Sequence, residues 1–200
     1  MIFLASEAAQ VIDRIDQRLP KTARRVSFIT TASNVYSEAP WVAADRDALV
    51  RIGREVASID LSVTKTASLE AQLLQSDIIF VCGGNTYYLL QESHKSGFST
   101  MLPSLLSQGK HYIGSSAGSL LLGPSLRSVR SLDDPTQAPD LTSEEALGLV
   151  PFVPLVHFGK EKYFLEYQKA LEQAFRNSES IVSIRDDQLL VCSEDGVRWG

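Results

Sequence analysis

The segment Gly114-Ser115-Ser116-Ala117-Gly118 has the residue types and the spacing of a nucleophile turn. The pattern G-x-S-x-G places a serine on a sharp turn between a strand and a helix, and its neighbours are small because the turn is tight. The N–H of Ala117, at the helix start, would face an oxyanion that forms beside the serine. The motif therefore predicts nucleophilic acyl transfer at Ser116. A small-residue turn that only packs a helix close to a strand is the alternative.

A serine nucleophile requires a base, and three histidines are available to supply it. His94 lies near the end of a predicted helix, where we expect a solvated capping residue. His111 begins the strand that leads to Ser116, which puts it at the amino end and on the wrong side of the sheet. His157 follows the apolar run Val153-Pro154-Leu155-Val156 at the carboxyl edge, where Ser116 also emerges. We therefore predict that His157 is the base.

The third member of a triad is a carboxylate that orients the imidazole. Asp133 and Asp134 lie between the predicted nucleophile and the predicted base, which gives the chain order Ser, Asp, His. The same segment, Asp133-Asp134-Pro135, also has the composition of an ordinary turn. We predict that one of the two aspartates orients His157, and the residues alone do not choose between them.

A second glycine-marked strand end occurs at Cys82-Gly-Gly-Asn-Thr86. A Gly-Gly turn between a strand and a helix presents backbone N–H groups, so Gly84 is predicted to supply the other half of an oxyanion hole. The three histidines and the two cysteines, Cys82 and Cys192, lack metal-ligand spacing, and no phosphate-binding glycine motif occurs. We therefore expect neither a metal nor a cofactor.

Short apolar runs alternate with helical periodicity along the chain, which predicts an α/β fold with a mostly parallel sheet and helices on both faces. In such sheets, chemistry gathers at the carboxyl ends of the strands. A single domain over residues 1–200 is expected. Strands are predicted at residues 26–31, 59–63, 77–82, 110–114, 152–158, 181–184 and 188–192, and helices at 41–57, 69–74, 87–95, 101–108, 117–122 and 160–175.

Composition narrows the class of protein. The net charge is −5 without a basic block, which disfavours nucleic-acid and membrane-surface binding. The N-terminus has no basic region ahead of its apolar residues, and no run is long enough to span a membrane. Two cysteines do not form a disulfide framework. We expect a cytoplasmic protein with a short peptide as its partner, and we leave open a homodimer.

Three segments together resemble the peptidase E family of α-aspartyl dipeptidases: Gly83-Gly-Asn-Thr-Tyr-Tyr-Leu-Leu90, Tyr112-Ile-Gly-Ser-Ser-Ala-Gly-Ser119, and Asp133-Asp-Pro with Ala138-Pro139. The resemblance runs from residue 26 to the end of the chain. It implies a fold similar to that of class I glutamine amidotransferases, with a serine where those enzymes carry a cysteine.

The resemblance also implies roles for individual residues. Ser116 would be the nucleophile and His157 the base, with Asp133 favoured over Asp134 as the acid. The oxyanion donors would fall on Gly84 and Ala117. The implied activity is release of an N-terminal aspartate from small peptides through an acyl-enzyme. An amidase or esterase with the same triad, and a catalytically silent binding protein on the same fold, are the alternatives.

An acidic substrate side chain needs a cation or converging donors in the pocket. Arg127 and Arg130 are the nearest basic residues in the sequence, and Asn85 and Thr86 are predicted to add neutral donors. The chain departs from many relatives in Val156-His157 and in the following segment Phe158-Gly159-Lys160-Glu161.

Overall fold

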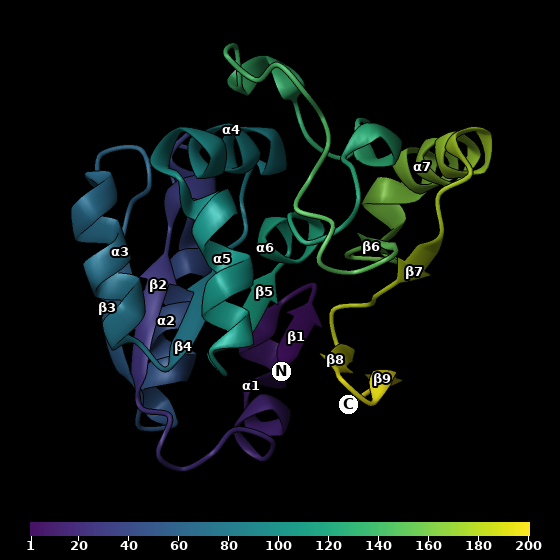
Figure 1. Ribbon diagram of the computed structural model, residues 1–200. Coiled ribbons are helices and arrows are strands. Elements are labelled where there is room, and N and C mark those ends of the chain that lie inside the picture. The colour runs from purple at the N-terminus through teal and green to yellow at the C-terminus, as the bar shows by residue number, and fades with distance from the viewer.

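The computed structural model describes residues 1–200 and shows an α/β fold built on a seven-stranded sheet (Figure 1). The strands are β1 (Ile2–Ala5), β2 (Arg25–Ile29), β3 (Glu55–Ile59), β4 (Ile78–Val81), β5 (His111–Ser115), β8 (Leu189–Ser193) and β9 (Gly196–Trp199). Their order in the sheet is β3-β2-β4-β5-β1-β8-β9. Strands β1 to β5 run parallel to one another, and β8 and β9 are antiparallel to their neighbours.

Helices cover both faces of this sheet, as predicted. Helices α1 (Ala8–Asp16) and α2 (Pro40–Arg51) pack on one face, and α3 (Thr66–Gln75), α4 (Thr86–Ser96), α5 (Phe98–Ser107) and α6 (Ala117–Leu120) pack on the other. Short 3-10 turns are η1 (Thr31–Ser33), η2 (Arg127–Val129), η3 (Pro135–Gln137) and η4 (Glu161–Tyr163). No helix is both long enough and apolar enough to cross a membrane.

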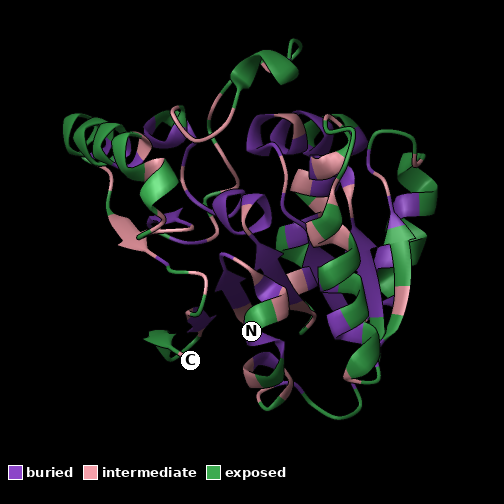
Figure 2. Ribbon diagram, turned by 180° about the vertical axis from the view of Figure 1, so that it is seen from behind, coloured by how far each residue is buried: buried purple, intermediate pink, exposed green.

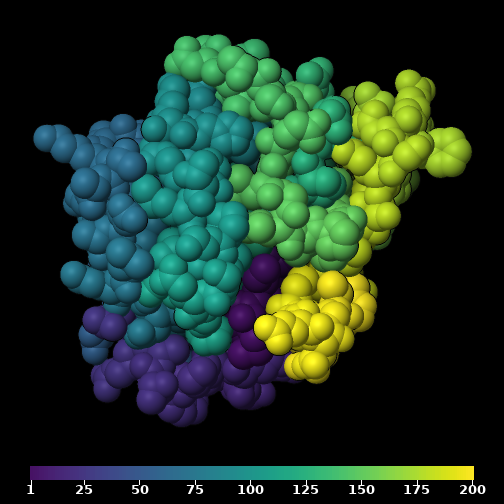
Figure 3. All heavy atoms as spheres, viewed as in Figure 1, coloured from purple at the N-terminus to yellow at the C-terminus, as the bar shows by residue number.

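A smaller unit lies beside the sheet (Figure 1). It contains β6 (Val153–Leu155) and β7 (Ile181–Ser183), which pair in parallel, and helix α7 (Phe164–Asn177). In the space-filling view α7 projects at one side, while the C-terminal strands lie against the N-terminal strand of the main sheet (Figure 3). This unit carries His157, so its position relative to the sheet decides whether the predicted nucleophile and base meet.

Strand β4 shows why the centre of the sheet was predictable. All four of its side chains are fully buried, because strands flank it and helices cover both faces. Ile79 and Val81 join one hydrophobic cluster, and Ile78 and Phe80 join the other. The strand delivers the Gly83–Gly84 turn to the carboxyl edge of the sheet.

The predicted helix at 41–57 and the predicted strand at 59–63 are wrong in their boundaries. Helix α2 ends at Arg51, because Gly53 adopts a left-handed φ of 79° that stops the helix. The strand is β3, Glu55–Ile59, at the edge of the sheet, where three of its five residues are exposed. Its apolar pattern was therefore weak. Strands β1 and β9 were not predicted.

Helix α7 buries a different face from the one its apolar pattern indicates. Four large apolar residues recur at helical spacing along this segment: Phe164, Tyr167, Leu171 and Phe175. Only Tyr167 is buried, and Phe175 is 88% exposed. Most of this helix is coloured as exposed in Figure 2. The buried side chains are Tyr167, Ala170 and Ala174. Small residues let the helix approach its neighbours closely, and the large apolar side chains remain outside.

Candidate active site

Ser116 occupies a strained turn between β5 and α6, as the motif predicts. Its φ of 51° and ψ of −109° lie outside the regions that a residue with a side chain prefers. A Cβ on Gly114 would lie 2.7 Å from backbone atoms of Gly118, and a Cβ on Gly118 would lie 2.2 Å from the Val81 carbonyl oxygen. Both glycines are therefore required for α6 to turn back against β4 and β5. The turn holds the Ser116 hydroxyl at the carboxyl edge of the sheet.

The imidazole of His157 meets this hydroxyl. The distance from Ser116 Oγ to His157 Nε2 is 2.9 Å. The backbone of His157 also has a positive φ, 57°, and it is held from two sides. Its N–H donates to Ser6 Oγ at 2.8 Å, and its carbonyl accepts a hydrogen bond from the Tyr167 hydroxyl. The Ser6 contact joins the β6–β7 unit to the residue that follows β1 of the main sheet, and the Tyr167 contact lies within the smaller unit.

The carboxylate that contacts His157 is Asp186, so the prediction of Asp133 or Asp134 is wrong. Asp186 Oδ1 lies 2.7 Å from His157 Nδ1. Asp133 instead accepts hydrogen bonds from the N–H and the hydroxyl of Thr86, at 2.9 and 2.5 Å. Asp134 accepts from the Thr136 N–H at 2.9 Å and is exposed.

The pairing of β6 with β7 explains why Asp186 reaches the imidazole. Leu155 pairs in parallel with Ser183, so the residues that follow the two strands leave the sheet at the same edge. His157 follows β6 by two residues, and Asp186 follows β7 by three. The signal available in the sequence was an aspartate after the apolar run 181–184, whereas chain order pointed to the earlier loop.

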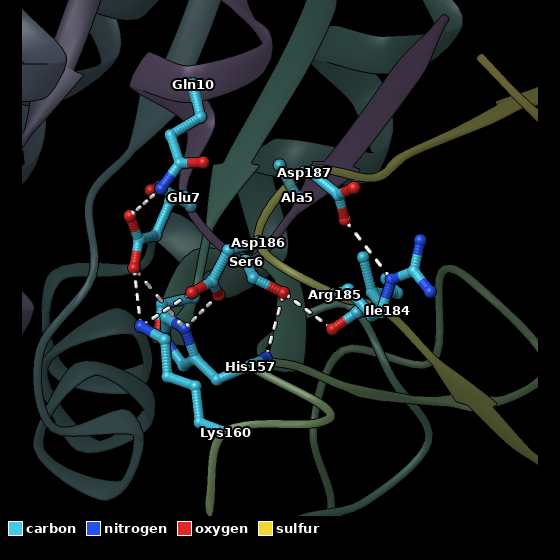
Figure 4. Close-up of polar contacts among 12 residues, drawn as sticks. Ala5, Ser6, Glu7, Gln10, His157, Lys160, Ile184, Arg185, Asp186 and Asp187 are labelled. Carbon is cyan, nitrogen blue, oxygen red and sulfur yellow. Dashed lines mark hydrogen bonds and ion pairs between the residues drawn. The ribbon is translucent and has the colours of Figure 1, made fainter.

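A lysine completes the polar network around the imidazole (Figure 4). Lys160 Nζ lies 2.6 Å from Asp186 Oδ2 and 2.6 Å from Glu7 Oε1. Burial opposes ionisation of Asp186, but hydrogen bonds from Lys160 and His157 outweigh it and lower the pKa of this carboxyl. Glu7, His157 and Asp186 are close enough to hold a metal ion, yet the Lys160 ammonium already supplies a cation to both carboxylates.

A cavity of about 460 Å³ opens beside Ser116 and His157. Aromatic side chains from different parts of the chain wall it: Tyr36, Trp41 and Tyr163. Its polar lining includes acidic residues and two lysines, Lys160 and Lys162. This volume falls within the ordinary range for small-molecule sites.

The Gly83–Gly84 turn borders the cavity next to Ser116. A Cβ on Gly83 would lie 3.1 Å from Ser116 Cβ, so a side chain there would crowd the Ser116 hydroxyl. Gly84 has a φ of 145°, and a Cβ on it would lie 2.1 Å from the Ala32 carbonyl oxygen. The Gly84 N–H donates to no acceptor within the protein. Ala117 begins α6, and the first N–H of a helix has no acceptor inside that helix.

Comparison with known proteins identifies the family. Residues 2–200 match the sequence model of peptidase family S51. The chain belongs to peptidase family S51. It is 32% identical over 180 residues to an uncharacterized peptidase of Listeria innocua, covering 86% of each chain. It is 37% identical over 123 residues to a peptidase E of Streptomyces coelicolor, covering 60% of this chain and 49% of that one.

The structure of this S51 peptidase agrees with the sequence match. A crystal structure of a Listeria monocytogenes protein, provisionally assigned to peptidase E, superposes with a TM-score of 0.91 at 28% identity. The match covers 100% of this chain and 96% of that chain. The expected fold and the expected serine peptidase family are both confirmed.

The residues predicted to bind substrate do not reach the cavity of the S51 peptidase. Asn85 is buried, its Oδ1 accepts from the Tyr88 N–H at 2.9 Å to cap α4, and its Nδ2 donates to the Asp134 carbonyl. Thr86 is fully buried beneath Asp133. Both residues position the loop instead of lining the site.

The two arginines proposed for an acidic substrate also lie elsewhere. Arg127 pairs with Glu145, and Arg130 pairs with Glu144 at 2.7 Å. They line a separate cavity of about 440 Å³ beside the 135–145 loop. The cations that border the active-site cavity are Lys160 and Lys162, neither of which the sequence had indicated.

Asp45 is a buried carboxyl that lines the cavity beside Ser116. Burial raises its pKa to about 7, and hydrogen bonds from Ser115 and from the Ala9 N–H only partly offset this effect. The folded protein therefore holds this proton up to about pH 7, while the unfolded chain releases it near pH 3.8. The free energy of unfolding should fall as pH rises through this window, because the folded state binds more protons.

Replacing Asp45 by asparagine is expected to remove this penalty. An uncharged amide keeps the acceptor for the Ala9 N–H. Between pH 5 and pH 8 the unfolding free energy of the native protein should therefore fall by about 3 kcal/mol relative to that of the variant, which corresponds to about two pH units at 1.36 kcal/mol each. Urea unfolding of both proteins at the two pH values measures the difference. Asp47→Asn, at an exposed position on the same helix, is the control. A gain as small as the control's would contradict the burial argument.

Proposed function

We propose that this S51 peptidase hydrolyses short peptides through Ser116, His157 and Asp186, with an acyl-enzyme intermediate. The observation that carries the proposal is the continuous hydrogen-bonded chain from Ser116 Oγ through the imidazole to Asp186, at the wall of a 460 Å³ cavity. A nucleophile, a base and an orienting carboxylate within hydrogen-bond reach are what triad chemistry requires.

The proposed reaction proceeds in two halves. His157 Nε2 takes the proton of Ser116 Oγ as that oxygen attacks the scissile carbonyl carbon, and Asp186 stabilises the imidazolium. The N–H groups of Gly84 and Ala117 stabilise the oxyanion. His157 then protonates the leaving amine nitrogen as the C–N bond breaks. In the second half, His157 takes a proton from the water that attacks the ester carbonyl carbon, and it returns this proton to Ser116 Oγ as the ester C–O bond breaks.

The charges in the cavity favour binding of a peptide by its N-terminal residue. Asp133 lines the cavity, and only one of its carboxyl oxygens, Oδ2, accepts hydrogen bonds from Thr86. No lysine or arginine forms an ion pair with Asp133. We expect this carboxylate to bind the N-terminal ammonium of the substrate, because that group supplies the missing positive charge.

We also propose that the enzyme prefers substrates with an acidic N-terminal residue. Lys162 borders the cavity, and its Nζ lies 4.4 Å from the centre of the Tyr163 ring without an acidic partner. Lys160, in contrast, is engaged by Glu7 and Asp186. Lys162 is therefore the cation available to an aspartate side chain. The resemblance of the chain to α-aspartyl dipeptidases also supports a peptide substrate with an N-terminal aspartate.

The proposal is tested with dipeptides of the form X-Leu, N-acetylated Asp-Leu, longer peptides and casein. We expect kcat/KM for Asp-Leu to exceed that for Ala-Leu by at least about tenfold, the order expected for one charged hydrogen bond. Lys162→Gln should lower the ratio of the two kcat/KM values, and N-acetylation of Asp-Leu should abolish its hydrolysis. Equal rates for Asp-Leu and Ala-Leu would overturn the aspartate preference. Rapid internal cleavage of casein would overturn the exopeptidase proposal and leave the serine peptidase.

A further inference from the structure

The peptide group between Gly83 and Gly84 has two orientations with opposite chemical consequences. A trans peptide is planar, so the Gly83 carbonyl and the Gly84 N–H point in opposite directions. Glycine on both sides removes the Cβ clashes that would otherwise restrict rotation of this plane. One orientation offers an N–H to an oxyanion beside Ser116, and the other offers a carbonyl oxygen, which would repel it.

A side chain fixes this peptide group. The indole Nε1–H of Trp41 donates to the Gly83 carbonyl oxygen at 2.9 Å. Trp41 lies in the first turn of α2, directly after Pro40, and is half-buried. The Tyr36 ring packs edge-on against the indole, with ring centroids 5.4 Å apart. The donor is therefore held in place.

The arrangement of layers indicates which way the N–H points. Helix α2 packs on the sheet face that α1 shares, whereas α6, which Ala117 begins, packs on the other face. A Gly83 carbonyl directed toward Trp41 on α2 directs the Gly84 N–H toward the α6 side. That is the side of the second donor, Ala117. The Gly84 N–H has no acceptor within the protein.

We propose that Trp41 is a positioning residue that holds the Gly83–Gly84 peptide with the Gly84 N–H directed at the oxyanion. The inference rests on the proposed function, since it assumes that Ser116 forms a tetrahedral intermediate. It gives Trp41 a role through Gly84 that is separate from its place in the cavity wall.

The test is Trp41→Phe, which keeps an aromatic ring and removes the N–H. Loss of one oxyanion donor lowers kcat by about 10² to 10³, and a peptide that is only partly reoriented loses less. We expect kcat for the best dipeptide to fall about 10- to 100-fold, with KM changed by less than about threefold. Affinity for a peptide aldehyde, which forms a hemiacetal oxyanion on the serine, should fall by the same factor as kcat.

Trp199→Phe is the matched control, because Trp199 is exposed on β9 and is the only other tryptophan. Trp199→Phe should leave kcat and the affinity for the peptide aldehyde unchanged. If Trp41→Phe does not fold, benzothienylalanine at position 41 keeps the bicyclic ring and replaces the N–H by sulfur. A rise in KM with unchanged aldehyde affinity would overturn the proposal. Fluorophosphonate labelling of Ser116 in the native protein tests the proposed function separately.

Discussion

Replacing Ser116 by alanine is expected to lower kcat by about 10⁶ and to leave the fold intact, as for removal of a triad nucleophile. The alanine side chain removes only the hydroxyl that lies 2.9 Å from His157 Nε2. The strained backbone of the turn is set by its neighbours and by the close packing of Gly114 and Gly118. Single-turnover hydrolysis of a dipeptide measures the loss, and thermal unfolding checks the fold. Activity above a few per cent would exclude Ser116 as the nucleophile.

The His157→Ala variant should lose nearly as much activity, and the double variant should be no worse than Ser116→Ala. The two side chains act as one unit, so their effects are not additive. A fluorophosphonate probe should label the native protein at Ser116 and label neither variant. His94→Ala is the control, because that histidine is exposed on α4. A folded native protein that the probe does not label would support a silent binding protein instead.

Asp186→Asn is expected to lower kcat by about 10⁴, the cost of losing the orienting carboxylate in a triad. An amide at this position can donate to the imidazole as well as accept from it, which favours the wrong tautomer at Nε2. The replacement also removes the ion pair between Asp186 and Lys160 Nζ. Both the magnitude of kcat and its pH dependence should change, because the charge that stabilises the imidazolium is gone.

Asp133→Asn is the matched comparison for this prediction. Asp133 lines the cavity but bonds to Thr86 rather than to His157. We expect its replacement to raise KM for dipeptides, through the lost ammonium contact, with a kcat loss far smaller than that of Asp186→Asn. The reverse order of kcat losses would restore Asp133 as the acid and overturn the assignment of Asp186.

Local physical chemistry was enough to predict the parts of the site that lie on the main sheet. The run Ile78–Cys82 is apolar because β4 is buried on both faces, and the glycines around Ser116 are required by contacts of less than 3 Å that any side chain would make. Such short-range constraints appear in the sequence as residue types at fixed spacing. They predicted the strand β4 and the turn that carries Ser116. His157 lies outside the main sheet and was predicted from the apolar run that precedes it.

Only the tertiary structure decided which carboxylate meets His157. Asp133 and Asp186 are both aspartates in loops, and nothing local distinguishes them. The choice follows from the parallel pairing of β6 with β7, which brings residues 157 and 186 to one edge. The contacts of Lys160 with Glu7 and of Trp41 with Gly83 likewise join segments far apart in the chain. Such contacts are set by how the layers pack, which no short window of sequence contains.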